Sequence, residues 1–284
     1  MFKLNWEICQ DNQLRFALRS SNAVVEHKNG SPNEQQMNET KTMLINVENG
    51  GWGSASTDNI MVLLVNTASQ INKHMRRPFN GEIIVKWWEQ GYPFTQYREA
   101  GTGPFTIYLP VQGTLWNQYA YQFSHEFCHI LSDCEKLSKK KNQWFHETVC
   151  EMASLFTLRS MSKEWAYKAP CSNWMSYASS LWDYAEESIR KVSPKLLRPE
   201  ELQQWLSENE DYLLDHNNDK DKNLIVAVAL LEIFEKIPGG WNTIARFPNS
   251  DERFEQYLRV WQSMVDDADK VIINRILSKL GFAA

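Results

Sequence analysis

The order of apolar and polar positions predicts strands in the first part of the chain. Compact or partly alternating apolar runs, which are typical of strands, occupy residues 1–26, 43–47, 81–88 and 103–110. The intervening stretch 27–42 is polar and contains Gly and Pro, so it predicts a loop. Because these runs are short and separated, they favour a small sheet.

Longer stretches with apolar residues at helical spacing predict helices. One helix begins at Ser56 or Thr57, either of which can act as an N-cap, and ends near Met75. Two more helices are predicted over 113–133 and 142–162, since no Pro or Gly interrupts them past the first residue. The later segments with a helical pattern are 173–191, 199–214, 222–237, 251–267 and 269–280.

Composition and charge are those of an ordinary globular protein. The 284 residues are 43% hydrophobic and 23% charged, and the formal net charge is −5. The negative balance and the lack of a basic stripe argue against nucleic acid as a partner. Neither a membrane-spanning run nor a signal peptide is recognisable. The sequence therefore predicts no membrane partner and a cytoplasmic protein, or a secreted one if a leader has been removed.

One short motif carries the candidate chemistry. Residues 125–129 read His-Glu-Phe-Cys-His, which matches the pattern His-Glu-x-x-His. On a helix, His125 and His129 lie four residues apart on one face, so their imidazoles can converge on one metal ion. Zn²⁺ is the usual occupant of such a pair, and the adjacent Glu126 can act as a general base on a water molecule.

A catalytic zinc site needs a third protein ligand and keeps one position open. A short-loop solution requires Gly and His three and six residues after His129, but these positions hold Ser132 and Glu135. The next predicted helix offers Glu147 and Glu151, which are four residues apart and share a face. A further candidate, His146, precedes Glu147 directly and therefore points about 100° away around the helix. From the residues alone, His146 is either a surface or cleft-rim residue or a substrate contact.

The segment from Trp144 to Ser154, together with the histidine motif, resembles the gluzincins, the zinc peptidases of the thermolysin and aminopeptidase type. In these enzymes a Glu on a second helix, about eighteen to twenty residues past the second His, completes the metal site. Here Glu147 lies eighteen positions after His129. The resemblance implies zinc ligation by His125, His129 and Glu147. It also implies that Glu151 hydrogen-bonds His125 and fixes its tautomer.

Five cysteines do not predict a disulfide framework, because their spacing is sparse and irregular. Cys128 and Cys150 lie on the two candidate metal helices. Since the x positions of the motif turn away from the metal, we expect buried thiols at the contact between these helices rather than metal ligands.

The stretch 103–110 is the candidate substrate strand. Pro104 and Pro110 cannot donate ladder hydrogen bonds, which favours an edge strand directly before the metal helix. An extended peptide can add to such an edge by main-chain hydrogen bonds, as substrates of gluzincins do. The alternative is an ordinary edge strand without a ligand. The residues expected to bind substrate are Phe105, Thr106, Ile107 and Tyr108.

Together these features predict an α+β fold. It comprises a small N-terminal mixed sheet with helices, a zincin-type metal helix under an edge strand, and a mostly helical C-terminal lobe. The first lobe, 1–133, carries the edge strand and the histidine motif. The second lobe, 134–284, carries the third zinc ligand.

The predicted function is zinc-dependent hydrolysis of peptide bonds in a peptide or protein substrate, with Glu126 as general base. No aminopeptidase-type Gly-Ala-Met-Glu-Asn segment precedes the motif, which favours an endopeptidase. The alternatives are a catalytically inactive binding or regulatory protein on the same scaffold, and a zinc hydrolase of a non-peptide substrate. The oligomeric state stays open. Family members add a Tyr or His to stabilise the oxyanion, and the candidates are Tyr167, Tyr177, Tyr184, Tyr212 and His216.

Overall fold

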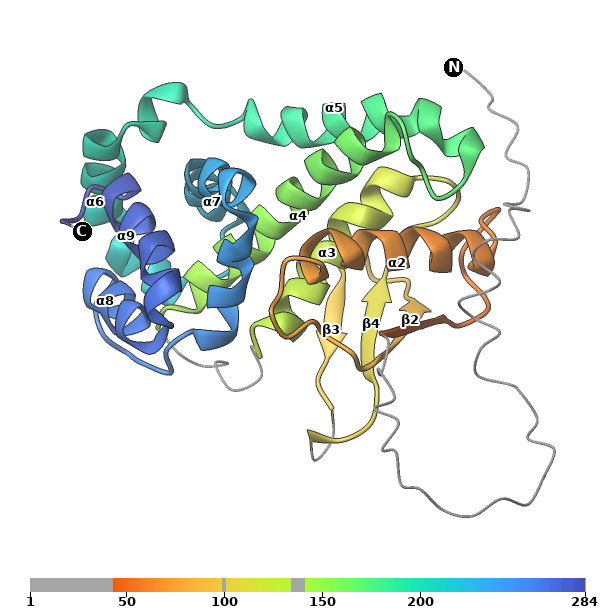
Figure 1. The fold of residues 1–284 in the computed structure, drawn as a ribbon, viewed down its shortest axis with the longest axis horizontal. Coiled ribbons are helices and arrows are strands. Elements are labelled where there is room, and N and C mark those ends of the chain that lie inside the picture. The colour runs from red at the N-terminus through yellow and green to blue at the C-terminus, as the bar shows by residue number, and fades with distance from the viewer. Residues whose placement is uncertain (1–42, 99–100, 134–140, 284) are drawn as a thin grey trace, which may run out of the picture.

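The structure is a computed structural model, and it describes residues 43–98, 101–133 and 141–283. The strand-like stretch 1–26 and the polar stretch 27–42 lie outside these residues. Figure 1 shows a small sheet with helices on one side of the molecule, and a group of helices that contains the C-terminus on the other.

A four-stranded mixed sheet forms the N-terminal part, with the strand order β1-β2-β4-β3. β1 pairs with β2 and β2 with β4 in parallel, whereas β3 runs antiparallel to β4. Three strands confirm the sequence pattern, but β3 is a three-residue strand that this pattern did not predict. The strands are β1 Leu44–Val47, β2 Glu82–Trp87, β3 Phe94–Gln96 and β4 Phe105–Leu109.

The prediction that 103–110 forms an edge strand is wrong. β4 is an internal strand with β2 on one side and β3 on the other. Pro104 and Pro110 lie just outside the strand Phe105–Leu109, so every residue that pairs in the ladder keeps its backbone N–H. The edge of the sheet next to β4 is β3 instead.

Helix α2, Thr57–Asn72, covers the sheet and begins where the sequence indicates. The Ser56 side chain is the N-cap and accepts a hydrogen bond from the backbone N–H of Asn59 at 3.2 Å. Ile60 and Leu64 are fully buried. This apolar face packs against β1 and against the next two helices, which anchors the histidine helix to the sheet.

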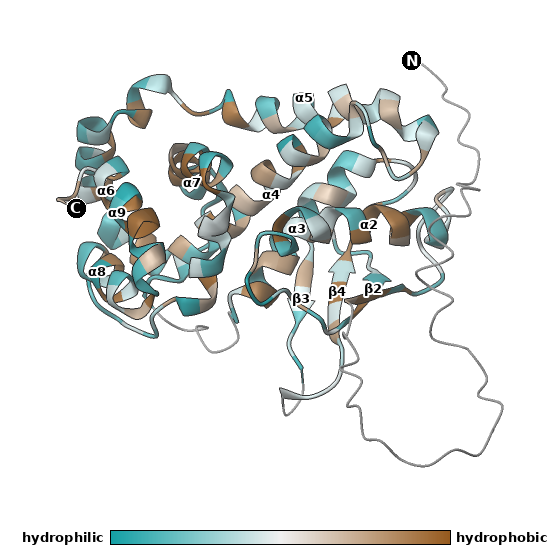
Figure 2. Ribbon diagram, in the orientation of Figure 1, coloured by the Kyte–Doolittle hydropathy of each residue, from teal (hydrophilic) through white to brown (hydrophobic). Residues whose placement is uncertain are grey.

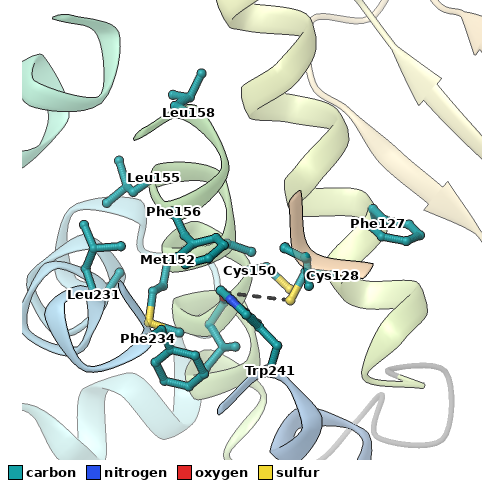
Figure 3. Packing of buried hydrophobic residues seen from close by; sticks show 14 of the residues in the cluster. Phe127, Cys128, Cys150, Met152, Leu155, Phe156, Leu158, Leu231, Phe234 and Trp241 are labelled. Carbon is teal, nitrogen blue, oxygen red and sulfur yellow. Dashed lines mark hydrogen bonds between the residues drawn. The ribbon is translucent and has the colours of Figure 1, made fainter. Parts of the chain in front are cut away.

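The two helices of the candidate site are α3, Trp116–Leu131, and α4, Gln143–Trp165. They pack against each other, and α4 also contacts the helices that follow it. Figure 3 shows Cys128 of α3 on one side of α4 and Phe234 of a later helix on the other. α4 is therefore a central helix that connects the sheet side of the molecule with the helical side.

The C-terminal part is almost wholly helical. Pro199 occupies the first turn of α6, as the sequence predicts. α7 is brown around most of its surface in Figure 2, since it packs in the middle of this group. Short 3₁₀ helices cover 172–177, 194–197, 238–246 and 267–269. The α-helices are α5 Ala178–Ile189, α6 Pro199–Asp215, α7 Lys220–Lys236, α8 Phe254–Met264 and α9 Lys270–Lys279.

The coarse fold prediction is thus confirmed: an α+β protein with an N-terminal mixed sheet and a mostly helical C-terminal part. The division into lobes at residue 133 stays a prediction. Within the described residues, none of the helices combines the length and apolar character needed to cross a membrane.

Candidate metal centre and cleft

Helix α3 presents the two histidines of the motif on one face. The rings of His125 and His129 have centroids 5.0 Å apart and planes at 72° to each other. Both side chains are mostly buried but keep some exposure, 19% for His125 and 11% for His129. The four-residue spacing thus brings the two imidazoles together as the sequence predicts.

Glu147 on α4 faces both of these rings. Its Oε2 atom lies 3.3 Å from Nε2 of His125, and its Oε1 atom lies 3.6 Å from Nε2 of His129. Ligand atoms bound tetrahedrally at ~2.0–2.1 Å from one zinc ion lie roughly 3.3 Å apart, so this spacing fits a shared ion. The structure therefore brings together the three residues that the resemblance implies.

The other nitrogen of each ring also has a neighbour. Nδ1 of His125 lies 3.9 Å from Oε2 of Glu151, whose other oxygen accepts a short hydrogen bond from the Tyr121 hydroxyl. Nδ1 of His129 lies 3.3 Å from Sγ of Cys150. The position of Glu151 agrees with its expected role beside His125, although 3.9 Å is an ion-pair distance rather than a hydrogen bond.

A second possible group of metal ligands includes this thiol. Among the described residues, ligand atoms of His125, His129 and Cys150 all lie within 4.8 Å of one another. Cys150 is 1% exposed, however, and it does not line the cleft in front of the histidines, whereas Glu147 does. A catalytic metal must keep one coordination position open to water and substrate, so the arrangement with Glu147 suits catalysis better.

Glu126 lines the same cleft and is only 4% exposed. Its Oε2 atom accepts a 2.8 Å hydrogen bond from the Thr95 hydroxyl, which belongs to the edge strand β3. Glu126 thus lines the same cleft as His125 and His129, and a carboxylate can act there as a general base on water.

The cleft has a volume of about 630 Å³ and separates β3 from the helical part. Three carboxylates of α3 and α4 line it, those of Glu126, Glu147 and Glu151. Of the five residues considered for oxyanion stabilisation, only Tyr184 on α5 lines the cleft. Burial, followed by the charges of Glu151 and Glu187, raises the pKa of Tyr184 above its ordinary value. Its hydroxyl therefore remains a hydrogen-bond donor at neutral and moderately alkaline pH.

The structure corrects the prediction made for His146. His146 is neither at the surface nor at the cleft rim, because it is 2% exposed and lies in the core. Its Nε2 atom is 2.6 Å from the Tyr257 hydroxyl, and its ring stacks on Phe247 with centroids 4.6 Å apart. The position one residue before Glu147 therefore faces the interior of the helical part.

The four residues expected to bind substrate lie on the internal strand β4, and none of them lines the cleft. Ile107 is fully buried beneath the helices. Tyr108 projects to the opposite face of the sheet, where its ring stacks on Phe94 at 4.4 Å. The strand that borders the cleft is β3, through Phe94 and Thr95.

Cys128 and Cys150, on α3 and α4, are buried as predicted and form no disulfide, whereas Cys171 is disulfide-bonded. Cys128 Sγ lies 3.9 Å from the backbone oxygen of Val149, which places it at the contact between α3 and α4. In Figure 3, Cys128 and Cys150 lie next to each other at this contact.

Sequence reasoning missed Tyr121 and Thr95. Tyr121 precedes His125 by four residues, so helical spacing alone places it on the same face of α3. Thr95 had no comparable signal, because its three-residue strand shows no usable alternation.

Comparison with known proteins adds no match: no family model fits the chain, and neither a curated protein nor a solved structure matches it.

Proposed function

We propose that the chain is a zinc-dependent peptidase that cleaves within peptide chains. The observation that supports this most is the approach of Glu147 to Nε2 of both His125 and His129, at 3.3 and 3.6 Å, beside an open cleft. Two imidazoles and one carboxylate are a donor set that suits Zn²⁺. An acid–base group, Glu126, lines the same cleft.

The residues of the chain have distinct roles in this proposal. A bound zinc ion would lower the pKa of water to near ~7 and polarise the carbonyl that is attacked. Glu126 takes the proton of the attacking water and returns it to the leaving amine. Tyr184 donates a hydrogen bond to the oxygen on which negative charge develops. Glu151 lies beside Nδ1 of His125 and Cys150 beside Nδ1 of His129, and each orients the ring that it faces.

The peptide binds along β3 rather than along the strand named from the sequence. In an antiparallel pair, the main-chain groups of alternate residues point to the partner strand, and those of the others point outward. β3 has a partner on one side only, among the described residues, so its outward groups can pair with an extended substrate. Pro93 precedes the strand and has no N–H, so it can accept but not donate a hydrogen bond to such a substrate.

The test is zinc content and cleavage of a peptide library, measured for the wild-type protein and for Glu126→Gln. We expect both proteins to bind one zinc ion, and the variant to lose about 10²–10⁴-fold in cleavage rate. Glu89→Gln, which changes an exposed glutamate, is the matched control and should cleave normally.

Two other results would contradict this proposal or favour a different function. Equal cleavage by the wild type and Glu126→Gln would exclude this mechanism. Zinc binding by a wild-type protein that cleaves no peptide would favour the inactive scaffold or a non-peptide substrate, and hydrolysis of small esters and amides would separate these two.

A further inference from the structure

Thr95 connects the edge strand with the helix that carries the histidine motif. In the sheet it pairs with Ile107, and paired residues project to the same side. Ile107 is fully buried under the helices, so the Thr95 side chain also projects toward α3. Its strand neighbours Phe94 and Gln96 project to the other face, where Gln96 contacts the Tyr108 hydroxyl at 3.1 Å. Only the middle residue of β3 can therefore reach the helix.

The Thr95 hydroxyl has two oxygens of Glu126 within reach but only one proton to donate. It lies 2.8 Å from Oε2 of the carboxylate and 3.3 Å from the backbone oxygen of the same residue. The shorter contact, to the side-chain oxygen, is the stronger hydrogen bond. Within the described residues, this hydroxyl is the one recorded hydrogen-bond donor to the Glu126 carboxylate. The Glu126 side chain, which is only 4% exposed, is thus fixed at its carboxylate end by the edge strand.

We propose that Thr95 is a positioning residue that holds the general base in place and links it to the strand that receives substrate. This inference rests on the proposed peptidase function. The Thr95 side chain hydrogen-bonds Glu126, and its backbone belongs to β3. The general base Glu126 therefore keeps a fixed distance from any peptide that pairs with this strand. Proton transfer requires heavy atoms within about 2.6–3.2 Å, and misplacement by about 1 Å is costly.

The test compares Thr95→Val, Thr95→Ser and the control Thr106→Val. Valine keeps the branched shape of threonine and removes the hydroxyl, whereas serine keeps the hydroxyl. Thr106 is a half-buried threonine of the adjacent strand β4, and it faces the other side of the sheet. All three variants should retain wild-type zinc content.

We expect Thr95→Val to lower kcat about 10–100-fold with KM within about 2-fold of wild type, since the lost contact orients the base and does not bind substrate. Thr95→Ser should restore most of kcat, and Thr106→Val should behave as wild type. An unchanged kcat in Thr95→Val, in a wild-type protein that cleaves peptides, would overturn the role of Thr95 and leave the peptidase function intact.

A second measurement, infrared spectroscopy, tests the hydrogen bond between Thr95 and Glu126 without relying on peptide cleavage. In metal-free protein, the infrared carboxylate bands of Glu126, identified by their loss in Glu126→Gln, should shift in Thr95→Val and return in Thr95→Ser. Absence of that shift would overturn the proposed contact. If the shift is present and the wild type cleaves no peptide, the hydrogen bond exists but the peptidase function, and with it the positioning role, is overturned.

Discussion

Cys150 Sγ lies 3.3 Å from Nδ1 of His129, and so contacts the ring nitrogen that does not face Glu147. Histidines that bind a metal usually donate their other ring N–H to a carboxylate, a carbonyl or water. In this chain a sulfur atom takes that place for His129, while Glu151 takes it for His125. Glu147 and Cys150 are therefore not equivalent candidates, since they lie at opposite nitrogens of the same ring.

Cobalt substitution tests this assignment directly. In Co²⁺-loaded protein we expect no strong sulfur-to-cobalt charge-transfer band in the near ultraviolet, because the proposed ligands are two imidazoles and the Glu147 carboxylate. Cys150→Ser should still bind one metal ion, with affinity lowered by no more than about 10–100-fold. An intense band that disappears in Cys150→Ser would instead show that the thiolate binds the metal.

Removal of the two α4 carboxylates that line the cleft, Glu147 and Glu151, should affect metal affinity unequally. Glu147→Ala removes a proposed ligand and should abolish most of the affinity, whereas Glu151→Ala removes only the neighbour of His125 and should cost about 10–100-fold. Tyr121→Phe, which removes the hydrogen bond to Glu151, should cost less than Glu151→Ala. Competition with a fluorescent zinc chelator measures all three, with the exposed Glu200→Ala as control. A larger loss for Glu151→Ala than for Glu147→Ala would exchange the roles of these residues.

Tyr184→Phe should lower kcat and leave zinc content unchanged. The loss of one donor to a developing oxyanion costs about 10²–10³-fold in the best-studied cases. Since the pKa of Tyr184 is raised by burial and by Glu151 and Glu187, the phenol stays protonated up to and beyond its ordinary pKa. Deprotonation of this tyrosine should therefore not limit the wild-type rate between about pH 7 and 9.

The control for this experiment is Tyr167→Phe, which changes a tyrosine that is 73% exposed and does not line the cleft. Equal rates for Tyr184→Phe and the wild type would assign oxyanion stabilisation to another group.

Local sequence signals predicted the parts of the fold that local physics determines. The N-cap Ser56, the first-turn Pro199 and the two histidines one turn apart depend on backbone geometry within a few residues. The strand order depends instead on pairing between distant segments. β3 pairs with β4 over three residues only, so its sequence has too few positions to show a period.

The same distinction explains the errors at the site. Helical geometry correctly turns His146 away from the face of α4 that lines the cleft, but it does not say what lies on the other side. That neighbour is supplied by Phe247 and Tyr257, more than a hundred residues later, which convert an expected rim position into a core one. The contact between Thr95 and Glu126 likewise exists only because the sheet places β3 beside α3.

The core position of His146 makes a prediction about stability. Tyr257→Phe removes the 2.6 Å hydrogen bond to His146 and should lower the free energy of unfolding by about 1 kcal/mol. His146→Ala also removes the ring that stacks on Phe247, and should lower it by about 2–4 kcal/mol. Urea unfolding of metal-free protein, followed by tryptophan fluorescence, measures both changes. The control is His216→Ala, an exposed histidine at the end of α6. Since His146 is 2% exposed and does not line the cleft, the folded variants should bind zinc as the wild type does. If these variants kept wild-type stability but bound less zinc or cleaved more slowly, His146 would have a role in the functional site rather than in the core.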